Sequence, residues 1–312
     1  MRVLIVGGNG FIGSHVVDEL LKQDINVVVL DRSPDRFRPP LPKVTYVVGD
    51  LNDGVSLESA TSRAIDSVVH LASSAAPKKS HDNPMSDLEE LAGALRLLEA
   101  CVKTKIKKVV FASSGGTVYG IPTILPIPED HPTEPICSYG ITKLVIEKYL
   151  HLYNHLSDIS TVILRIANPY GIRQSPDADQ GVVPVFMKKM IRGDRLTVWG
   201  DGSVVRDFLN VRDLARLFVL ALQSEATGIF NVGSGIGTSI NELLALIAFH
   251  LGVKPQVSRE PSRKFDAPTV ILDCKKAKTV YSWEPSITLA EGLNELAGWL
   301  TSTETRSATC HL

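Results

Sequence analysis

The sequence has few cysteines, no long hydrophobic run and no excess of charge of either sign. Its four cysteines form no C-x-x-C pair, so their spacing favours neither a disulfide framework nor a zinc site, and we expect no bound metal. No apolar run approaches the roughly 20 residues that a membrane-spanning helix needs, and we expect no signal peptide. A net charge of −1 gives no sign of a nucleic-acid partner or of membrane insertion. We therefore expect a cytoplasmic protein.

What the sequence does contain is a regular alternation of strand and helix patterns. Its 312 residues are enough for one large α/β domain, or for a domain with a smaller lobe. In the first half, short β-branched runs predict strands at 2–6, 26–30, 44–48, 67–71, 107–113 and 161–166. Helical patterns lie between them, at 11–22, 57–64, 85–103 and 139–156. Continuous apolar strands that alternate with helices predict a doubly wound parallel sheet of the Rossmann type, covered on both faces.

After residue 167 the sequence pattern changes. Proline and glycine become frequent, and the predicted strands become shorter. Strands are predicted at 196–199, 206–209, 229–232 and 270–272, and helices at 182–192, 211–223, 240–251 and 289–300. We expect residues 1–166 to form the parallel-sheet domain and 167–300 mainly a smaller α/β lobe. Segments near 211–232 are expected to return to the main sheet, and 301–312 to form a flexible tail.

One predicted helix carries more apolar surface than one sheet contact requires. The helix at 139–156 is apolar on more than one side, and the helix at 85–103 carries leucines at helical spacing. The surplus apolar face predicts a homodimer that packs through these two helices. A covering loop would explain the same pattern.

A glycine-rich segment follows the first predicted strand and opens the first helix. Gly7 permits the tight turn, Gly10 lets the backbone approach a pyrophosphate, and Gly13 allows close packing of the helix on the strand. The N–H groups at that helix N-terminus favour the phosphates electrostatically. This context predicts a dinucleotide site rather than a glycine-rich turn without a ligand.

Acidic residues at the ends of the next two strands indicate which dinucleotide binds. Asp31 ends the second strand, where a carboxylate hydrogen-bonds a ribose 2′-hydroxyl and repels a 2′-phosphate. This favours NAD over NADP, although the neighbouring Arg32 weakens the preference. Asp50 follows the third strand and is a candidate acceptor for the adenine amino group.

A tyrosine and a lysine stand four residues apart at the start of a predicted helix. Tyr139 and Lys143 therefore lie on one helix face, where an ammonium lowers the pKa of a phenol and makes it a usable base. The strand at 107–113 delivers Ser114 or Thr117 to the edge of the sheet where ligands bind, and either hydroxyl can orient a substrate oxygen. The alternative is an ordinary surface pair of tyrosine and lysine.

Further motifs follow one another in order over most of the chain. They are GGNGFIG at 7–13, GDL at 49–51, HLAS at 70–73, SSGGTVYG at 113–120, YGITK at 139–143, RIANPYG at 165–171, WGDGSVVRDF at 199–208 and FNVGSG at 230–235. Together they resemble the extended short-chain dehydrogenases/reductases of the sugar-nucleotide epimerase/dehydratase family. Within it, the similarity is greatest to 4-epimerases that act on UDP-glucose, UDP-hexosamines or UDP-uronates.

The resemblance implies roles for particular residues. Ser114, Tyr139 and Lys143 take the catalytic places, with Thr117 as the second candidate for the hydroxyl. The cofactor pocket would be formed by Gly7, Gly10, Phe11, Ile12, Gly13, Asp31, Arg32, Asp50, Leu51, Leu71, Ala72, Ser73, Ser113, Tyr139, Lys143 and Pro169. Tyr139 would take the proton of the sugar 4-hydroxyl while NAD accepts and later returns the C4 hydride.

The same resemblance makes the C-terminal lobe the substrate-binding part and implies a UDP-sugar substrate. Its contacts would be Ser114, Thr117, Tyr139, Asn168, Val183, Trp199, Arg206, Arg263 and Asp266. The two arginines would hold the diphosphate, because a planar guanidinium meets phosphate oxygens in pairs. The alternatives are a local ion pair between Arg206 and Asp207, and a half-buried core position for Trp199.

Three positions depart from the family pattern. Glu90 aligns where the family often has asparagine, at a position that borders the cofactor. Gly115 stands where many epimerases carry their serine or threonine, which leaves both Ser114 and Thr117 as candidates. Val270 aligns with a position whose bulk is thought to limit an N-acetyl group, and valine is small enough to leave N-acetylhexosamines open.

The sequence therefore predicts an NAD-dependent epimerase that inverts C4 of a UDP-hexose. A 4,6-dehydratase would need an acid–base pair directly after its catalytic threonine, and no carboxylate stands beside Thr117. A 4-keto reductase would consume NADPH, against which Asp31 argues. A non-catalytic dinucleotide sensor would have little need of Tyr139 and Lys143.

Overall fold

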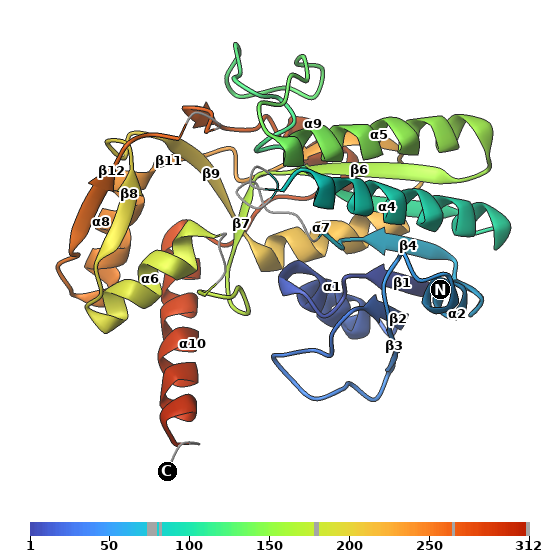
Figure 1. Cartoon of the computed structure of the whole chain (residues 1–312), viewed down its shortest axis with the longest axis horizontal. Coiled ribbons are helices and arrows are strands. Elements are labelled where there is room, and N and C mark those ends of the chain that lie inside the picture. Colours follow the sequence, from blue (N-terminus) through green and yellow to red (C-terminus); the bar gives the residue numbers. More distant parts are fainter. Residues whose placement is uncertain (74–79, 81–82, 178–180, 264–265, 310–312) are drawn as a thin grey trace.

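A seven-stranded parallel sheet forms the centre of the computed structural model, which describes residues 1–73, 80, 83–177, 181–263 and 266–309 (Figure 1). Its strands are β1 (Arg2–Val6), β2 (Asn26–Asp31), β3 (Val44–Val48), β4 (Ser67–His70), β5 (Lys108–Ser114), β6 (Ser160–Ile166) and β10 (Gly228–Val232). They lie in the order β10-β6-β5-β4-β1-β2-β3, and every neighbouring pair is parallel. The predicted Rossmann-type fold is confirmed.

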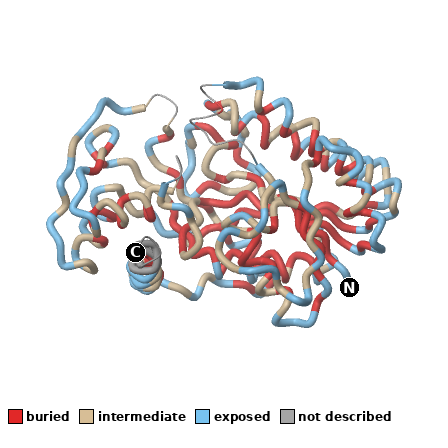
Figure 2. Tube along the Cα trace, turned by 60° about the horizontal axis from the view of Figure 1, so that its bottom comes forward, coloured by how far each residue is buried: buried red, intermediate tan, exposed pale blue. Residues whose placement is uncertain are grey.

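Helices cover both faces of this sheet because its strands are apolar on both sides. The helices are α1 (Phe11–Lys22) and α7 (Val211–Gln223) on one face, and α2 (Gly54–Thr61), α4 (Met85–Lys103) and α5 (Ser138–Leu156) on the other. In β1, Val3 and Ile5 pack with α1 and α7, whereas Leu4 and Val6 pack toward α2, α4 and α5. Figure 2 shows buried residues running through the sheet between these layers. Each fully buried aliphatic side chain stabilises the fold by about 1.5–3 kcal/mol.

The second lobe is built from segments that leave the sheet after β6. Its strands are β7 (Asn168–Tyr170), β8 (Leu196–Trp199), β9 (Val205–Asn210), β11 (Gly237–Ser239), β12 (Val257–Glu260) and β13 (Thr269–Val270). Its helices are α6 (Val182–Arg192), α8 (Ile240–Leu251) and α10 (Leu289–Thr309), whose apolar sides share one core. Between them, α7 and β10 return to the main sheet, where β10 pairs with β6.

Several boundaries differ from the sequence-based expectation, each for a local reason. Helix α2 begins at Gly54 rather than 57, because the Asp53 carboxylate accepts hydrogen bonds from the backbone N–H groups of Val55 and Ser56. Helix α10 continues to Thr309, past the predicted end at 300, because a helix already formed gains one hydrogen bond per added residue. The expected flexible tail is thus helical over 301–309, and 310–312 lie outside the described residues.

The elements that the sequence patterns missed are short. They are β7, β11, β12 and α9 (Lys275–Tyr281), which are too brief for a period of two or of 3.6 residues to stand out. Among the described residues, no helix is long and apolar enough to cross a membrane.

Candidate active site

The turn between β1 and α1 leaves room for a ligand that approaches the backbone closely. Gly7 has a φ of +83°, and a Cβ added there would lie 2.8 Å from the backbone nitrogen of Ala72. A Cβ on Gly13 would lie 2.2 Å from the carbonyl oxygen of Gly7. Only glycine fits at either position, so the strand, the turn and the helix pack together without side chains between them.

The start of α1 is a site for negative charge. Gly10 is the N-cap residue, and within the described part of the chain no side chain caps this helix end. A Cβ on Gly10 would approach only the carbonyl oxygen of Gly7, at 3.3 Å, so its outer side is open. The N–H groups of the first turn thus remain for an anion. This cradle fits the pyrophosphate of a dinucleotide.

Asp31 lies beside the cradle at the end of β2. Its carboxylate accepts hydrogen bonds from the backbone N–H groups of Asn9, at 3.0 Å, and Ser33, at 3.1 Å. These bonds hold the carboxylate next to the glycine turn, where a ribose hydroxyl would meet it. The Arg32 guanidinium is directed at the Asp50 carboxylate, 3.8 Å away, and both side chains remain partly exposed.

The segment after β4 lies beside the same glycine turn. Leu71 donates a backbone hydrogen bond to Val6 and so continues the pairing of β4 with β1. Phe11 and Ile12 are half-buried at the start of α1, and Leu51 is buried beside Gly93 of α4. These positions agree with the expected lining of the cofactor pocket, which stays a prediction.

Ser113 differs from its expected role, because its side chain belongs to the core. Its hydroxyl donates a hydrogen bond to Glu147, whose carboxylate also pairs with the Arg165 guanidinium at 2.7 Å. All three side chains are buried. Only the backbone atoms of Ser113 therefore remain for a contact with a cofactor.

Tyr139 and Lys143 occupy the first turns of α5, one turn apart as the sequence predicted. The Lys143 ammonium lies 5.4 Å from the centre of the Tyr139 ring and 5.0 Å from that of Phe111. Burial raises the pKa of Tyr139, and the positive charge of Lys143 acts against that rise. A half-buried phenol beside a buried ammonium is a group that can hold and release one proton.

Lys143 has a partner that the sequence motifs did not indicate. The Oε1 atom of Glu90, on α4, lies 3.0 Å from its Nζ atom, and both side chains are 4% exposed. Burial works to lower the pKa of Lys143, but the nearby Glu90 carboxylate outweighs it and raises that pKa. No local pattern could have revealed this pair, because the two residues come from different helices.

Ser114 is the last residue of β5, and Thr117 lies on the turn that follows it, close to the start of α5. The Thr117 N–H donates to the Ser114 carbonyl at 3.2 Å, and a Cβ on Gly140 would lie 2.8 Å from the Thr117 carbonyl oxygen. The Thr117 hydroxyl oxygen is buried and has no hydrogen-bond partner among the described residues. A buried hydroxyl without a partner costs about 1–3 kcal/mol, so this group is available to a ligand.

The predicted diphosphate arginines lie in the second lobe. Arg206, on β9, donates to the backbone carbonyls of Val205 and Ala267, and its Nη2 atom lies 3.7 Å from Asp266. Its alternative partner Asp207 instead accepts hydrogen bonds from Ser234 and from backbone N–H groups. The alternative interpretation, a local ion pair between Arg206 and Asp207, is therefore wrong.

Trp199 ends β8 at the lobe surface. The Arg263 guanidinium lies over its ring, 4.3 Å from the ring centre, and the residue is 42% exposed. Trp199 is thus a surface aromatic platform rather than a half-buried core residue. Val183 and Val270, in contrast to Trp199, are buried. Each is 1% exposed and packs inside a core cluster.

Asn168 and Pro169 belong to β7, which links the main sheet to the lobe. The Asn168 amide donates to the Asp207 carbonyl at 3.4 Å, and the Pro169 carbonyl accepts from Gln174 at 3.3 Å. Both residues are half-buried at the junction of the two parts, where a ligand bound to both would lie.

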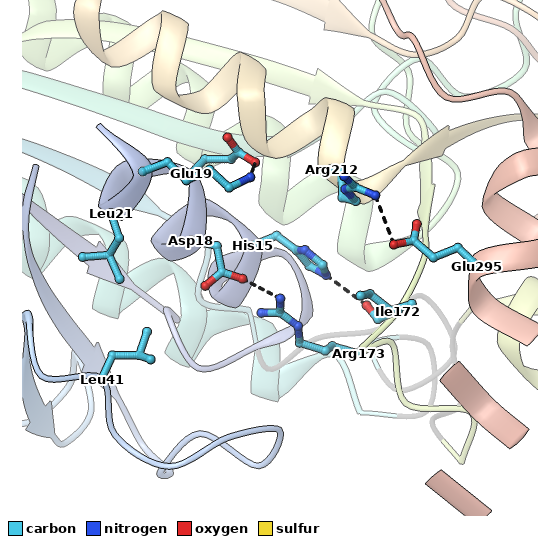
Figure 3. Close-up of a pocket in the computed structure, with 10 residues that line it drawn as sticks. His15, Asp18, Glu19, Leu21, Leu41, Ile172, Arg173, Arg212 and Glu295 are labelled. Atoms are coloured by element: carbon cyan, nitrogen blue, oxygen red, sulfur yellow. Dashed lines mark hydrogen bonds and ion pairs between the residues drawn. The ribbon is translucent and has the colours of Figure 1, made fainter. Parts of the chain in front are cut away.

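A separate hollow of about 640 Å³ lies between α1, α7 and α10 (Figure 3). Its charged side chains pair with one another, as in Asp18 with Arg173 and Arg212 with Glu295. His15 bonds to the Ile172 carbonyl, and burial lowers its pKa to about 4, so it is uncharged at neutral pH. None of the predicted site residues lines this hollow, and the chemistry described above lies elsewhere.

Comparison with known proteins identifies the family to which this chain is similar. A model of the NAD dependent epimerase/dehydratase family matches residues 3–233. A protein of Methanocaldococcus jannaschii described as a putative UDP-glucose 4-epimerase is 37% identical over 300 residues, which cover 96% of this chain and 98% of that protein.

Two solved structures are similar over nearly the whole chain. The UDP-glucose 4-epimerase of Thermotoga maritima, solved with UDP-glucose, has a TM-score of 0.94 and 35% identity, covering 97% of this chain and 100% of that one. The UDP-glucose 4-epimerase of Thermus thermophilus, in complex with NAD, has a TM-score of 0.92 and 35% identity, covering 96% and 99%.

Proposed function

Because this chain belongs to the NAD dependent epimerase/dehydratase family, we propose that it is an NAD-dependent 4-epimerase that inverts C4 of a UDP-hexose. The observation that carries the proposal is the contact of Tyr139 with the buried Lys143 ammonium, together with a glycine cradle that fits NAD. NAD, when bound, accepts the hydride of C4 and gives it back. UDP-glucose, UDP-N-acetylglucosamine and UDP-glucuronate are the candidate substrates.

The chain's own residues would handle the proton of the reaction. The phenolate oxygen of Tyr139 takes the proton of the sugar 4-hydroxyl and later returns it to the 4-keto oxygen. Lys143 favours the phenolate by its charge, and the Thr117 hydroxyl, buried without a partner, orients the substrate oxygen. Ser114, at the end of β5, is the alternative hydroxyl.

The second lobe would bind the nucleotide half of the substrate. Arg206 and Arg263 suit a diphosphate, Trp199 offers an exposed ring to a base, and Asp266 is an acceptor for ribose hydroxyls. Asn168 supplies an amide at the junction between the lobe and the sheet. This division assigns residues 1–166 to the cofactor and 167–300 mainly to the substrate.

The purified protein is expected to form the 4-epimer of at least one of UDP-glucose, UDP-N-acetylglucosamine and UDP-glucuronate without added NADPH. Each sugar nucleotide is incubated separately, and the products are resolved by chromatography. Because the hydride is returned, no net cofactor is consumed. Consumption of NADPH with an added 4-keto sugar nucleotide, and no 4-epimer from these three sugars, would indicate a 4-keto reductase; loss of the 6-hydroxyl would indicate a dehydratase. No product from any of the three would contradict the proposal.

We also propose that the protein is a homodimer, joined through α4 and α5. The two helices pack side by side on one face of the sheet (Figure 1). On α5 the exposed apolar residues Ile141, Leu152 and Leu156 fall on one stripe, and on α4 Leu88 and Val102 do the same. Contiguous apolar surface of this kind is typical of a protein interface.

Replacing Leu152 with arginine is expected to convert the dimer into a monomer, because the charge would have to be buried without a partner. Light scattering should then give the mass of a single 33.9 kDa chain for the variant and twice that mass for the unchanged protein. Phe249→Arg on α8, where the apolar side chain is 82% exposed, is the control and should stay dimeric. A monomeric unchanged protein would refute the assembly.

A cytoplasmic location is proposed on the state of the cysteines. The three that the structure describes are unpaired and buried, which suits a reducing compartment.

A further inference from the structure

Glu90 is a buried carboxylate at the centre of the candidate site. It lies on the side of α4 that faces α5 and the segment after β4, and it is buried. Its Oε1 atom lies 3.0 Å from the Lys143 ammonium, and its Oε2 atom accepts a hydrogen bond of 2.8 Å from the Ser73 hydroxyl. Three separate segments therefore meet at this one carboxylate.

A carboxylate at this depth is costly unless a cation lies opposite. Burial by itself raises the pKa of Glu90, but Lys143 and the Ser73 hydroxyl lower it below its usual value, so the group is ionised. An amide, which the family pattern often has here, would fill similar space without the charge. The negative charge is thus the feature of this position that needs an explanation.

The other titratable groups around Tyr139 and Lys143 do not supply the same charge balance. His70 is fully buried, and burial lowers its pKa to about 4, so it is neutral. Asp87, one turn before Glu90 on α4, accepts hydrogen bonds from the Ser80 and Ser138 hydroxyls instead of pairing with Lys143. Burial raises the pKa of the Cys137 thiol and keeps it neutral.

We propose that Glu90 is a positioning residue of the active site, whose buried carboxylate fixes the Lys143 ammonium beside Tyr139 and offsets its positive charge. The proposal rests on the proposed function of Tyr139 as the base. It goes further, because it assigns the charge balance of the site to a residue outside the tyrosine–lysine motif.

The charge of Glu90 makes proton loss from Tyr139 and Lys143 more difficult. With Glu90 ionised, the side chains of Tyr139, Lys143 and Glu90 together carry no net charge. When either Tyr139 or Lys143 loses a proton, the three side chains carry one negative charge. With a neutral residue at 90 they carry one positive charge before and none after. Removing the carboxylate therefore makes proton loss easier, whichever of the two groups releases the proton.

Glu90→Gln is expected to lower the pH at which Tyr139 ionises by about one unit. The ultraviolet absorbance of tyrosinate, recorded against pH on the purified protein without substrate, measures this directly. Subtracting the same titration of a protein that also carries Tyr139→Phe isolates the signal of Tyr139. The acidic limb of kcat/KM against pH should move downward by the same amount.

Glu89→Gln is the matched control, because Glu89 neighbours Glu90 on α4 but is exposed to solvent. The charge change is identical, and the tyrosinate titration and the pH profile should both stay as in the unchanged protein. Glu90→Asp keeps the charge and should leave the tyrosinate midpoint close to its original value. A merely structural role of Glu90 would lower activity at every pH without moving either curve.

An unmoved tyrosinate titration in Glu90→Gln would overturn the proposal, as would an equal shift in Glu89→Gln. If the glutamine variant does not fold, Glu90→Asn removes the same charge with a smaller amide and is judged by the same shift. Because the titration needs no substrate, it distinguishes failure of this proposal from failure of the epimerase assignment, which the product analysis tests.

Discussion

Tyr139→Phe is expected to abolish epimerisation while the protein keeps its fold and its NAD. The substitution removes only the phenolic oxygen, the atom that exchanges a proton with the sugar 4-hydroxyl. Loss of one general acid–base group lowers kcat by about 10²–10⁴-fold. Lys143 keeps its ion pair with Glu90 at 3.0 Å, so no buried charge is left without a partner and the stability should change little.

Initial rates of 4-epimer formation measure this effect, and extraction of the bound nucleotide measures the NAD content. Tyr153→Phe serves as the control, because it deletes the same atom from the same helix roughly four turns away from Tyr139. The control should keep full activity. If Tyr139→Phe were nearly as active as the control, Tyr139 would not be the group that transfers the proton.

Gly13→Ala should yield a protein that no longer retains NAD. The added methyl group would lie 2.2 Å from the Gly7 carbonyl oxygen and 2.7 Å from the Gly8 Cα atom. Both are backbone atoms, so α1 must move away from the turn, and the N–H groups that face the pyrophosphate move with it. Overpacking of this kind also costs about 1–3 kcal/mol of folding free energy.

The NAD content of the purified variant and its thermal unfolding together test this result. Gly298→Ala is the control, because Gly298 is exposed in α10 and a Cβ there meets nothing within 4 Å. That substitution should keep NAD and stabilise the helix by about 0.5–1 kcal/mol. A Gly13→Ala protein with a full complement of NAD would show that the turn does not form the cofactor cradle.

Most of the fold was predictable because its signals are local. The patterns for α1, α4, α6 and α7 gave the bounds that the structure has, since each helix is long and its apolar residues follow one period. Short elements such as β7 and β11 carry too few residues for a period to appear. Helix α2 began earlier than predicted because a cap at Asp53, rather than apolar spacing, sets its start.

In the candidate site, too, features of contiguous residues were predictable, and contacts between distant residues were not. The glycine turn and the spacing of Tyr139 and Lys143 are properties of contiguous residues, and the structure places them as expected. The side-chain orientations of Arg206 and Ser113 were not predictable, because each depends on partners far away along the chain. Arg206 bonds to the carbonyl of Ala267, and Ser113 to Glu147.

The sheet, the cofactor cradle and the tyrosine–lysine motif can be read from the amino-acid sequence. Each is encoded by spacing within one strand, turn or helix. The surroundings of Lys143 cannot be read in this way, because its contact with Glu90 depends on how α5 packs against α4. A short-range pattern cannot specify a contact between two helices. The charge that Tyr139 experiences is therefore a property of the folded chain.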